Sequence, residues 1–237
     1  MSVDVSGYGA HDDVRQQEIQ RTLLDILDVA GARAGLARQR WKRQAKGDEE
    51  LSLVPPDEPH QRVAGEFCLE LEAVLHGHNL GRDRSDRLRL RLAIDEGPAD
   101  DAANGYVGRA VVGASRLCSS QVARQALNAC PDANLVVIVS HGVFRDHVDS
   151  GRGALRRDHF RRVAVKEKEV DEYAWVWVPG AAEQPDLAPD PASRTSPPDT
   201  PGAPASGVSG HGQQVHNRFV SPVTIHGGDP VFGIRNG

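Results

Sequence analysis

Two hydrophobic periods alternate along residues 1–180 of the chain. Apolar side chains three or four positions apart predict helices over residues 12–34, 63–75 and 108–128, with a short helix over 143–148. Alternating or continuous apolar runs predict strands over residues 1–6, 40–45, 51–54, 88–94, 135–139, 160–165 and 173–178. The order strand, helix, strand, strand, helix, strand, followed by further elements, predicts an α/β (α+β) fold: a ferredoxin-like βαββαβ core with additional C-terminal strands.

The composition changes sharply after residue 180. Residues 181–213 consist mainly of Pro, Ala, Ser, Gly and Asp and contain almost no large apolar side chain. Such a segment cannot bury enough surface to offset its conformational entropy, so we expect a disordered linker. Short alternating apolar runs return around a Gly-Gly turn in residues 214–237. The predicted organisation is therefore a domain (1–180), a linker (181–213) and a short β-prone tail (214–237).

Charge and cysteine content exclude several classes of protein. The formal net charge of −5 over 237 residues argues against broad nucleic-acid binding. No apolar run approaches the roughly 18 residues of a membrane span, and the N-terminus lacks a signal-peptide pattern, so we expect a cytoplasmic protein without a membrane partner. Cys68 and Cys118 fall on apolar helix faces and are predicted to be buried thiols. His141 and His147 have no evident partner in the sequence.

Two carboxylates stand where the predicted topology brings them together. Asp4 ends the first strand, before a turn of small residues in the run 4–9 (DVSGYG), and the free N–H groups of such a turn suit phosphate oxygens. Asp48 lies in the Gly47-Asp48 hairpin turn, which a βαββ unit places beside the first strand. Paired carboxylates are a reasonable site for hard divalent cations. Either aspartate taken alone is better explained as an ordinary helix cap or hairpin-turn residue; the pair in this context favours a metal role.

A third motif follows, Gly105-Tyr106-Val107-Gly108 and then a helix with Ala114-Ser115-Arg116-Leu117. In this order the three features resemble class III nucleotidyl (adenylate/guanylate) cyclases. Residues 4–9 are similar to that family's Asp-Ile-x-Gly-Phe-Thr motif, Gly47-Asp48 to its Gly-Asp hairpin, and residues 111–117 to its Val-Asn-x-Ala-x-Arg-Leu helix. The resemblance spans almost all of residues 1–180.

The resemblance implies a head-to-tail homodimer with composite sites that bind an NTP and two Mg²⁺ or Mn²⁺ ions. The ribose 3′-hydroxyl would attack the α-phosphorus and expel pyrophosphate. The implied residues are Asp4, Val5 and Asp48 for the metals, Ser6, Gly7 and Tyr8 for phosphate, and Arg116 and Lys166 for catalysis. Arg116 fits a surface helix charge equally well, and Lys166 fits a solvated strand residue.

Three positions depart from the family pattern. The ribose-orienting asparagine falls at Val112, and the two base-selecting positions fall at Gln44 and Gly105. The metal half of the site is therefore kept, whereas the half that reads base and ribose is changed. Two functions stay open: an active cyclase of weak or altered specificity, and an inactive nucleotide-sensing or scaffold module.

Residues 215–233 resemble the C-terminal amyloid signalling motifs of bacterial NLR-type immune systems, which carry Asn-x-Phe, Val-x-Ile and Gly-Gly elements. Here these elements are residues 217–219, 223–225 and 227–228. The resemblance implies an NLR-type receptor as partner and a role in bacterial signalling or anti-phage defence. Assembly would raise the local concentration and favour the dimer. A flexible tail, or a strand that pairs with the chain's own domain, is the alternative.

Overall fold

The computed structural model describes residues 1–151, 153–167 and 170–187, with the backbone alone at 167, 170 and 171. The predicted tail and most of the predicted linker lie outside these residues.

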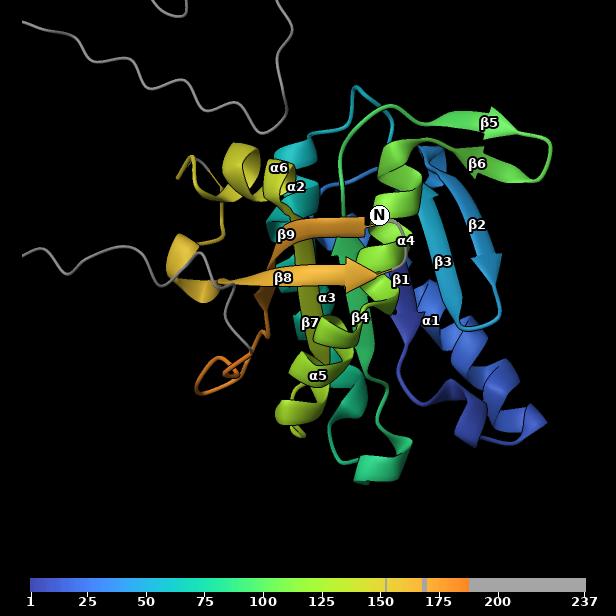
Figure 1. The fold of residues 1–237 in the computed structure, drawn as a ribbon. Coiled ribbons are helices and arrows are strands. Elements are labelled where there is room, and N and C mark those ends of the chain that lie inside the picture. The colour runs from blue at the N-terminus through green and yellow to red at the C-terminus, as the bar shows by residue number, and fades with distance from the viewer. Residues whose placement is uncertain (152, 168–169, 188–237) are drawn as a thin grey trace, which may run out of the picture. The chain divides into compact units, whose positions relative to one another are not determined.

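A seven-stranded sheet has the strand order β2-β3-β1-β4-β7-β9-β8 (Figure 1). Its strands are β1 (Ser2–Val5), β2 (Lys42–Lys46), β3 (Glu49–Leu53), β4 (Leu90–Ile94), β7 (Leu135–Ser140), β8 (Arg161–Glu167) and β9 (Val170–Trp177). Neighbouring strands are antiparallel except β4 and β7, which are parallel. The first four strands have the order β4-β1-β3-β2, which confirms the predicted ferredoxin-like core.

Helices cover both faces of this sheet because successive strand residues point to opposite sides. One face packs under α1 (Asp13–Arg33), α2 (His60–Ala64) and α3 (Glu66–Asn79), through apolar residues such as Val3, Leu92 and Val137. The other face packs under α4 (Arg109–Ser119) and α5 (Gln121–Ala129), through residues such as Ala93 and Ile138. In Figure 1, α4 and α5 lie on one side of the sheet and α3 on the other.

Two predicted helices are each divided in the structure. The helix expected over 63–75 begins earlier, as α2, and breaks at Gly65 before α3. The helix expected over 108–128 breaks at Ser120, whose hydroxyl accepts a hydrogen bond from the Ala123 N–H and so begins α5. Apolar periodicity runs through both breaks, so it could not reveal them.

Two smaller differences concern loops. The segment after β4 holds a hairpin that the sequence did not predict, β5 (Asp100–Ala102) and β6 (Gly105–Val107), because strands of three residues leave no periodic pattern. The predicted helix over 143–148 is α6 (His141–Val143) followed by a π-helical turn.

Both predicted buried thiols are buried and free. No helix in the described part of the chain combines the length and the apolar character that a membrane span requires.

Candidate functional site

Asp4 and Asp48 lie side by side at one end of β1. Asp4 is directly opposite Glu49, the first residue of β3, and Asp48 is the turn residue before it. The Val5 N–H donates to the Asp48 carbonyl oxygen at 3.1 Å, while the Val5 side chain is buried in the core, so a ligand at this point could meet only its backbone. The structure thus brings together the two carboxylates that the sequence selected.

Arg91 on β4 is the ion-pair partner of Asp4, and the sequence did not point to it. Its Nη2 donates to Asp4 Oδ2 at 2.5 Å, and the two residues are directly opposite in the β1–β4 register. Asp4 is only 7% exposed, and its second oxygen, Oδ1, is buried without a hydrogen-bond partner among the described residues. A buried acceptor without a donor costs about 1–3 kcal/mol, so Oδ1 is the atom where a ligand is expected.

The electrostatics of Asp4 reflect a crowded acidic end of the sheet. Burial raises the pKa of the Asp4 carboxyl, the hydrogen bond and charge of Arg91 lower it, and the carboxylates of Asp48 and Glu49 raise it again; the net direction is upward. A bound cation would relieve this repulsion.

The donor set fits a hard divalent cation. Asp4 offers a free carboxylate oxygen and Asp48 a half-buried carboxylate, and Mg²⁺ is commonly held by one or two carboxylates together with substrate phosphates and water. The described residues contain no group of three or more His, Cys, Asp or Glu side chains placed to hold a metal ion by themselves. The protein would therefore supply part of the coordination and the substrate the rest.

The turn after β1 offers fewer phosphate donors than the sequence suggested. Gly7 has φ +82°, the left-handed region that suits glycine. The Ser6 N–H donates to the Arg89 carbonyl at 2.8 Å, so it is not available to phosphate. The Tyr8 hydroxyl accepts from Gln20 Nε2 at 2.5 Å, which directs this side chain towards α1. The backbone N–H groups of Gly7 and Tyr8 and the Ser6 hydroxyl stay candidates for a phosphate role in this turn.

The two base-selecting positions meet in the structure although they are far apart in sequence. A Cβ added to Gly105 would lie 2.6 Å from Gln44 Oε1, so the Gln44 amide occupies the space of a side chain at 105. An ion pair between Lys42 and Asp101 also joins β2 to the β5–β6 hairpin. The two positions are adjacent, but together they offer a base only the amide of Gln44, where the family pattern has two base-selecting side chains.

The remaining candidates are spread over α4 and β8. Val112 is 46% exposed and carries no polar atom, and Arg116 follows one helical turn later on the same side of α4. Lys166 is exposed on the edge strand β8, and β4, β7 and β9 separate it from β1. Four strand spacings correspond to about 19 Å, so Lys166 does not reach Asp4 within one chain.

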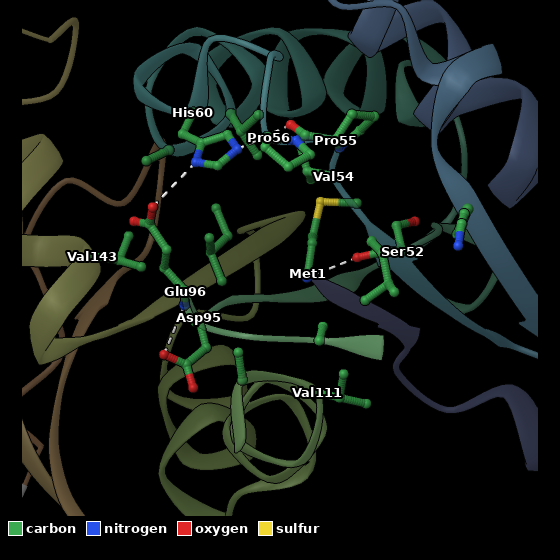
Figure 2. A pocket seen from close by; sticks show the side chains of 18 of the residues that line it. Met1, Ser52, Val54, Pro55, Pro56, His60, Asp95, Glu96, Val111 and Val143 are labelled. Atoms are coloured by element: carbon green, nitrogen blue, oxygen red, sulfur yellow. Dashed lines mark hydrogen bonds and ion pairs between the residues drawn. The ribbon is translucent and has the colours of Figure 1, made fainter. Parts of the chain in front are cut away.

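A pocket of about 740 Å³ opens at the opposite end of β1 (Figure 2). Figure 2 shows His60 and Pro55 on one side of it, Val111 of α4 on the other, and Asp95 and Glu96 between them. The length of β1 separates it from Asp4, roughly 10 Å at 3.3 Å per residue.

Histidines beside this pocket do have partners, contrary to the sequence interpretation. Glu96 lies between two imidazoles: Oε2 is 2.7 Å from His147 Nε2, and Oε1 is 3.1 Å from His60 Nδ1. His141 Nδ1 accepts from Trp175 Nε1 at 3.2 Å. These pairs join segments distant in sequence, which no local pattern could indicate.

Comparison with known proteins identifies structures with a similar fold. The sequence matches no protein-family model, and a search of curated proteins finds no relative. The catalytic core of a rhodopsin-guanylyl cyclase in complex with ATPαS superposes with a TM-score of 0.50 at 13% identity, covering 75% of this chain and 92% of that one. An adenylate/guanylate cyclase/hydrolase from Silicibacter pomeroyi (TM-score 0.49, 21% identity, 76% and 95% covered) and an adenylyl cyclase from P. aeruginosa (0.49, 16%, 76% and 93%) also match. The superposition on the rhodopsin-guanylyl cyclase core shows that the chain has the fold of nucleotidyl cyclase catalytic domains.

Proposed function

We propose that this chain is a divergent nucleotidyl cyclase-like effector that binds an NTP together with Mg²⁺ or Mn²⁺ at Asp4 and Asp48. The observation that carries the proposal is Asp4 Oδ1, which is buried beside the Asp48 turn of a cyclase fold and has no hydrogen-bond partner among the described residues. A carboxylate with both oxygens hydrogen-bonded would need no ligand, whereas Asp4 has one oxygen without a hydrogen bond from the described residues.

The proposed reaction forms a 3′,5′-cyclic nucleotide and pyrophosphate. The ribose 3′-oxygen loses its proton and bonds to the α-phosphorus, while the bond from that phosphorus to the bridging oxygen of pyrophosphate breaks. Divalent cations bound at the site would neutralise the triphosphate and favour ionisation of the 3′-hydroxyl. Asp4 and Asp48 would fix the triphosphate end, with the backbone of Gly7 and Tyr8 beside it. A guanidinium such as that of Arg116 would balance charge on the α-phosphate.

The proposed site is completed by a second copy of the chain in a head-to-tail homodimer. Lys166 supports this arrangement, because about 19 Å of sheet separates it from Asp4 in the same chain. A partner's Arg116 and Lys166 would then face the first chain's carboxylates.

A second function is favoured by a different observation. Val112 has no hydrogen-bonding atom with which to orient a ribose, and Gly105 and Gln44 offer a single amide to a base. These residues favour a catalytically inactive nucleotide-sensing or scaffold module that keeps the triphosphate half of the site.

The biological setting follows from the tail and is likewise proposed. Residues 214–237, outside the described residues, would bind an NLR-type receptor through an amyloid-type motif in bacterial signalling or anti-phage defence. A peptide of residues 214–237 that stays monomeric and dye-negative at high concentration would contradict this assignment.

Product analysis separates the two functions. The purified full chain is incubated with Mn²⁺ and each of the four NTPs, and the products are identified by mass spectrometry. Cyclic product from wild type and from Asp132→Ala, whose carboxylate is a surface partner of Arg84, but not from Asp48→Ala, establishes a cyclase. Retained NTP binding without product from any NTP would leave the sensing module.

A further inference from the structure

We propose that Arg91 is a positioning residue of the metal site, which holds Asp4 Oδ2 and so presents Oδ1 to a divalent cation. This inference rests on the proposed function and adds Arg91 to the residues of the proposed metal site. It follows from four observations on the Asp4–Arg91 pair.

The first observation is the division of the Asp4 carboxylate between its two oxygens. Arg91 Nη2 donates to Oδ2 at 2.5 Å, while Asp4 Oδ1 and Arg91 Nε are each buried without a partner among the described residues. A guanidinium can bind a carboxylate through both oxygens, which is the stronger arrangement. Here only Oδ2 accepts a hydrogen bond from Arg91, and Oδ1 stays available to a ligand.

The second observation is that the side chains of Asp4 and Arg91 are closely surrounded by other residues. The Arg91 and Asp4 side chains are 12% and 10% exposed. They point to the face that α4 covers, and the Cys118 thiol of α4 donates to the Arg91 carbonyl at 3.3 Å. The pair therefore has little room to change its geometry, as a device that orients a ligand requires.

The third observation is the charge pattern across the sheet. Residues directly opposite one another form the row Lys46, Glu49, Asp4, Arg91 over strands β2, β3, β1 and β4. Like charges directly opposite destabilise a sheet, and Glu49 faces Asp4. Arg91 balances this repulsion from the β4 side only, so the side towards Asp48 and Glu49 keeps an excess of negative charge.

The fourth observation is the contrast with Arg89, two residues earlier on the same side of the chain. Arg89 donates to the backbone carbonyls of Leu127, Cys130 and Ala133, at 2.6 to 2.8 Å. Its three acceptors lie at and after the end of α5, and the carbonyls of Leu127 and Cys130 also accept from backbone N–H groups, so Arg89 reinforces the end of this helix. Arg89 is thus an arginine with a purely structural role, and it provides a matched control for Arg91.

Two effects of Arg91 on cation binding have opposite signs, so the test depends on direction. As a mere positive charge beside the site, Arg91 repels a cation, and its removal would tighten binding. As a positioning residue it fixes a ligand, and its removal would weaken binding, typically by 10- to 100-fold for groups that orient metal ligands. Loss of the Arg91 donor would leave both Asp4 oxygens without a partner, and the carboxylate would no longer hold one orientation.

The experiment measures Mn²⁺ binding to the full chain, with and without a 3′-deoxynucleoside triphosphate that supplies phosphate ligands but cannot cyclise, by isothermal titration calorimetry and by the electron paramagnetic resonance line shape of the bound ion. Wild type, Asp4→Asn, Arg91→Met, Arg91→Lys and Arg89→Met are compared, and thermal unfolding establishes that each variant is folded. We expect Arg91→Met to weaken Mn²⁺ binding by about tenfold or more and to change the line shape. Arg91→Lys, which keeps a donor and the charge, should recover most of the affinity, and Arg89→Met should bind as wild type although it unfolds at a lower temperature.

The outcomes distinguish this inference from the proposed function. If wild type binds Mn²⁺, Asp4→Asn does not, and Arg91→Met binds equally or more tightly, the role of Arg91 is overturned while the metal site stands. If wild type binds Mn²⁺ neither with nor without the 3′-deoxynucleotide, or if Asp4→Asn binds as well as wild type, the metal site itself is wrong and the inference falls with it. If Arg91→Met does not fold, failure of Arg91→Lys to bind more tightly than Asp4→Asn overturns the inference.

Discussion

Each face of the sheet holds a buried arginine–carboxylate pair. The two carboxylates differ in how many of their oxygens accept a hydrogen bond. On the face covered by α1 and α3, Glu50 accepts from Arg38 through both oxygens, at 2.8 and 3.2 Å, and from the Ser52 hydroxyl at 2.5 Å. On the face covered by α4, Asp4 accepts from Arg91 through one oxygen, and the other has no partner in the described part of the chain.

The difference indicates which carboxylate is structural. Glu50 and Arg38 are 1% and 2% exposed, and Arg38 also donates to Asp28 at 3.0 Å and lies 5.1 Å from the centre of the Trp41 ring. No oxygen of Glu50 remains for a ligand. A buried pair of this kind fixes the packing of its surroundings, whereas a pair with an open oxygen has capacity to bind.

The largest expected effect comes from breaking the closed pair. Glu50→Gln keeps the size of the side chain but leaves Arg38 buried without its main counter-charge, which typically costs 3–5 kcal/mol. Because Asp28 still balances part of the charge, we predict a loss near the lower limit, about 3 kcal/mol in the free energy of unfolding. Urea denaturation at pH 7 measures it, and a loss below about 1 kcal/mol would show that this pair does not hold the fold.

Glu72 on α3 sharpens the comparison, because it has one open oxygen and no arginine. Its Oε1 accepts from Asn134 Nδ2 at 3.0 Å, and its Oε2 is buried without a partner among the described residues. Burial raises the pKa of Glu72 to about 7, with the Asn134 hydrogen bond opposing this shift. Burial raises the pKa of both carboxyls, but only at Asp4 does an arginine oppose the shift; the Glu72 carboxyl, without a counter-charge, is protonated below about pH 7.

This difference predicts a dependence of stability on pH. Since the pKa of Glu72 is higher in the folded chain than in the unfolded chain, its contribution is complete below about pH 4.5, falls as the pH rises to about 7, and changes little above that. Glu72→Gln should remove about 2 kcal/mol of this dependence, a value reduced for partial exposure. Unfolding free energies of wild type and Glu72→Gln between pH 4.5 and 8 test it; parallel curves would contradict it.

Much of the fold could be predicted because its determinants are local in sequence. Apolar periodicity gave the strands and helices of the core, and the Gly-Asp turn and the strand-to-turn motif gave Asp48 and Asp4. The helix breaks at Gly65 and Ser120 were missed because single residues interrupt an otherwise continuous apolar face.

The contacts that the sequence did not reveal, one at Asp4 and one beside the pocket, depend on strand register and on loop packing. Arg91 is one polar residue in an alternating strand, and it gains meaning only when β4 pairs with β1 and places it opposite Asp4, 87 residues away. His147 and Glu96 are 51 residues apart; they meet because the π-helical turn after α6 lies beside the loop that follows β4. Neither pairing leaves a mark in the local sequence.

Asp4→Asn should have a much smaller effect on stability than Glu50→Gln, although both replace a carboxylate by its amide. The carbonyl oxygen of the new amide could still accept from Arg91, while Asp48 and Glu49 continue to balance the guanidinium. We predict a change within about 1 kcal/mol in urea denaturation. A loss as large as that of Glu50→Gln would place Asp4 among structural residues and remove the distinction between the two faces.

The smallest effect is expected at Glu96, which is satisfied like Glu50 but is 45% exposed. Burial raises the pKa of its carboxyl, but hydrogen bonds from His147 and His60 outweigh this and bring the pKa below its usual range. Its contribution is therefore present at neutral pH and is lost as the pH falls through the lowered pKa. Since exposed polar contacts of this kind contribute up to about 1 kcal/mol, Glu96→Gln should lower the unfolding free energy by no more than this at pH 7, and by progressively less as the Glu96 carboxyl is protonated in acid. A loss of about 3 kcal/mol, equal to that expected for Glu50→Gln, would mean that hydrogen bonds to both oxygens are enough to make a carboxylate structural. The small loss expected here would show that burial is required as well.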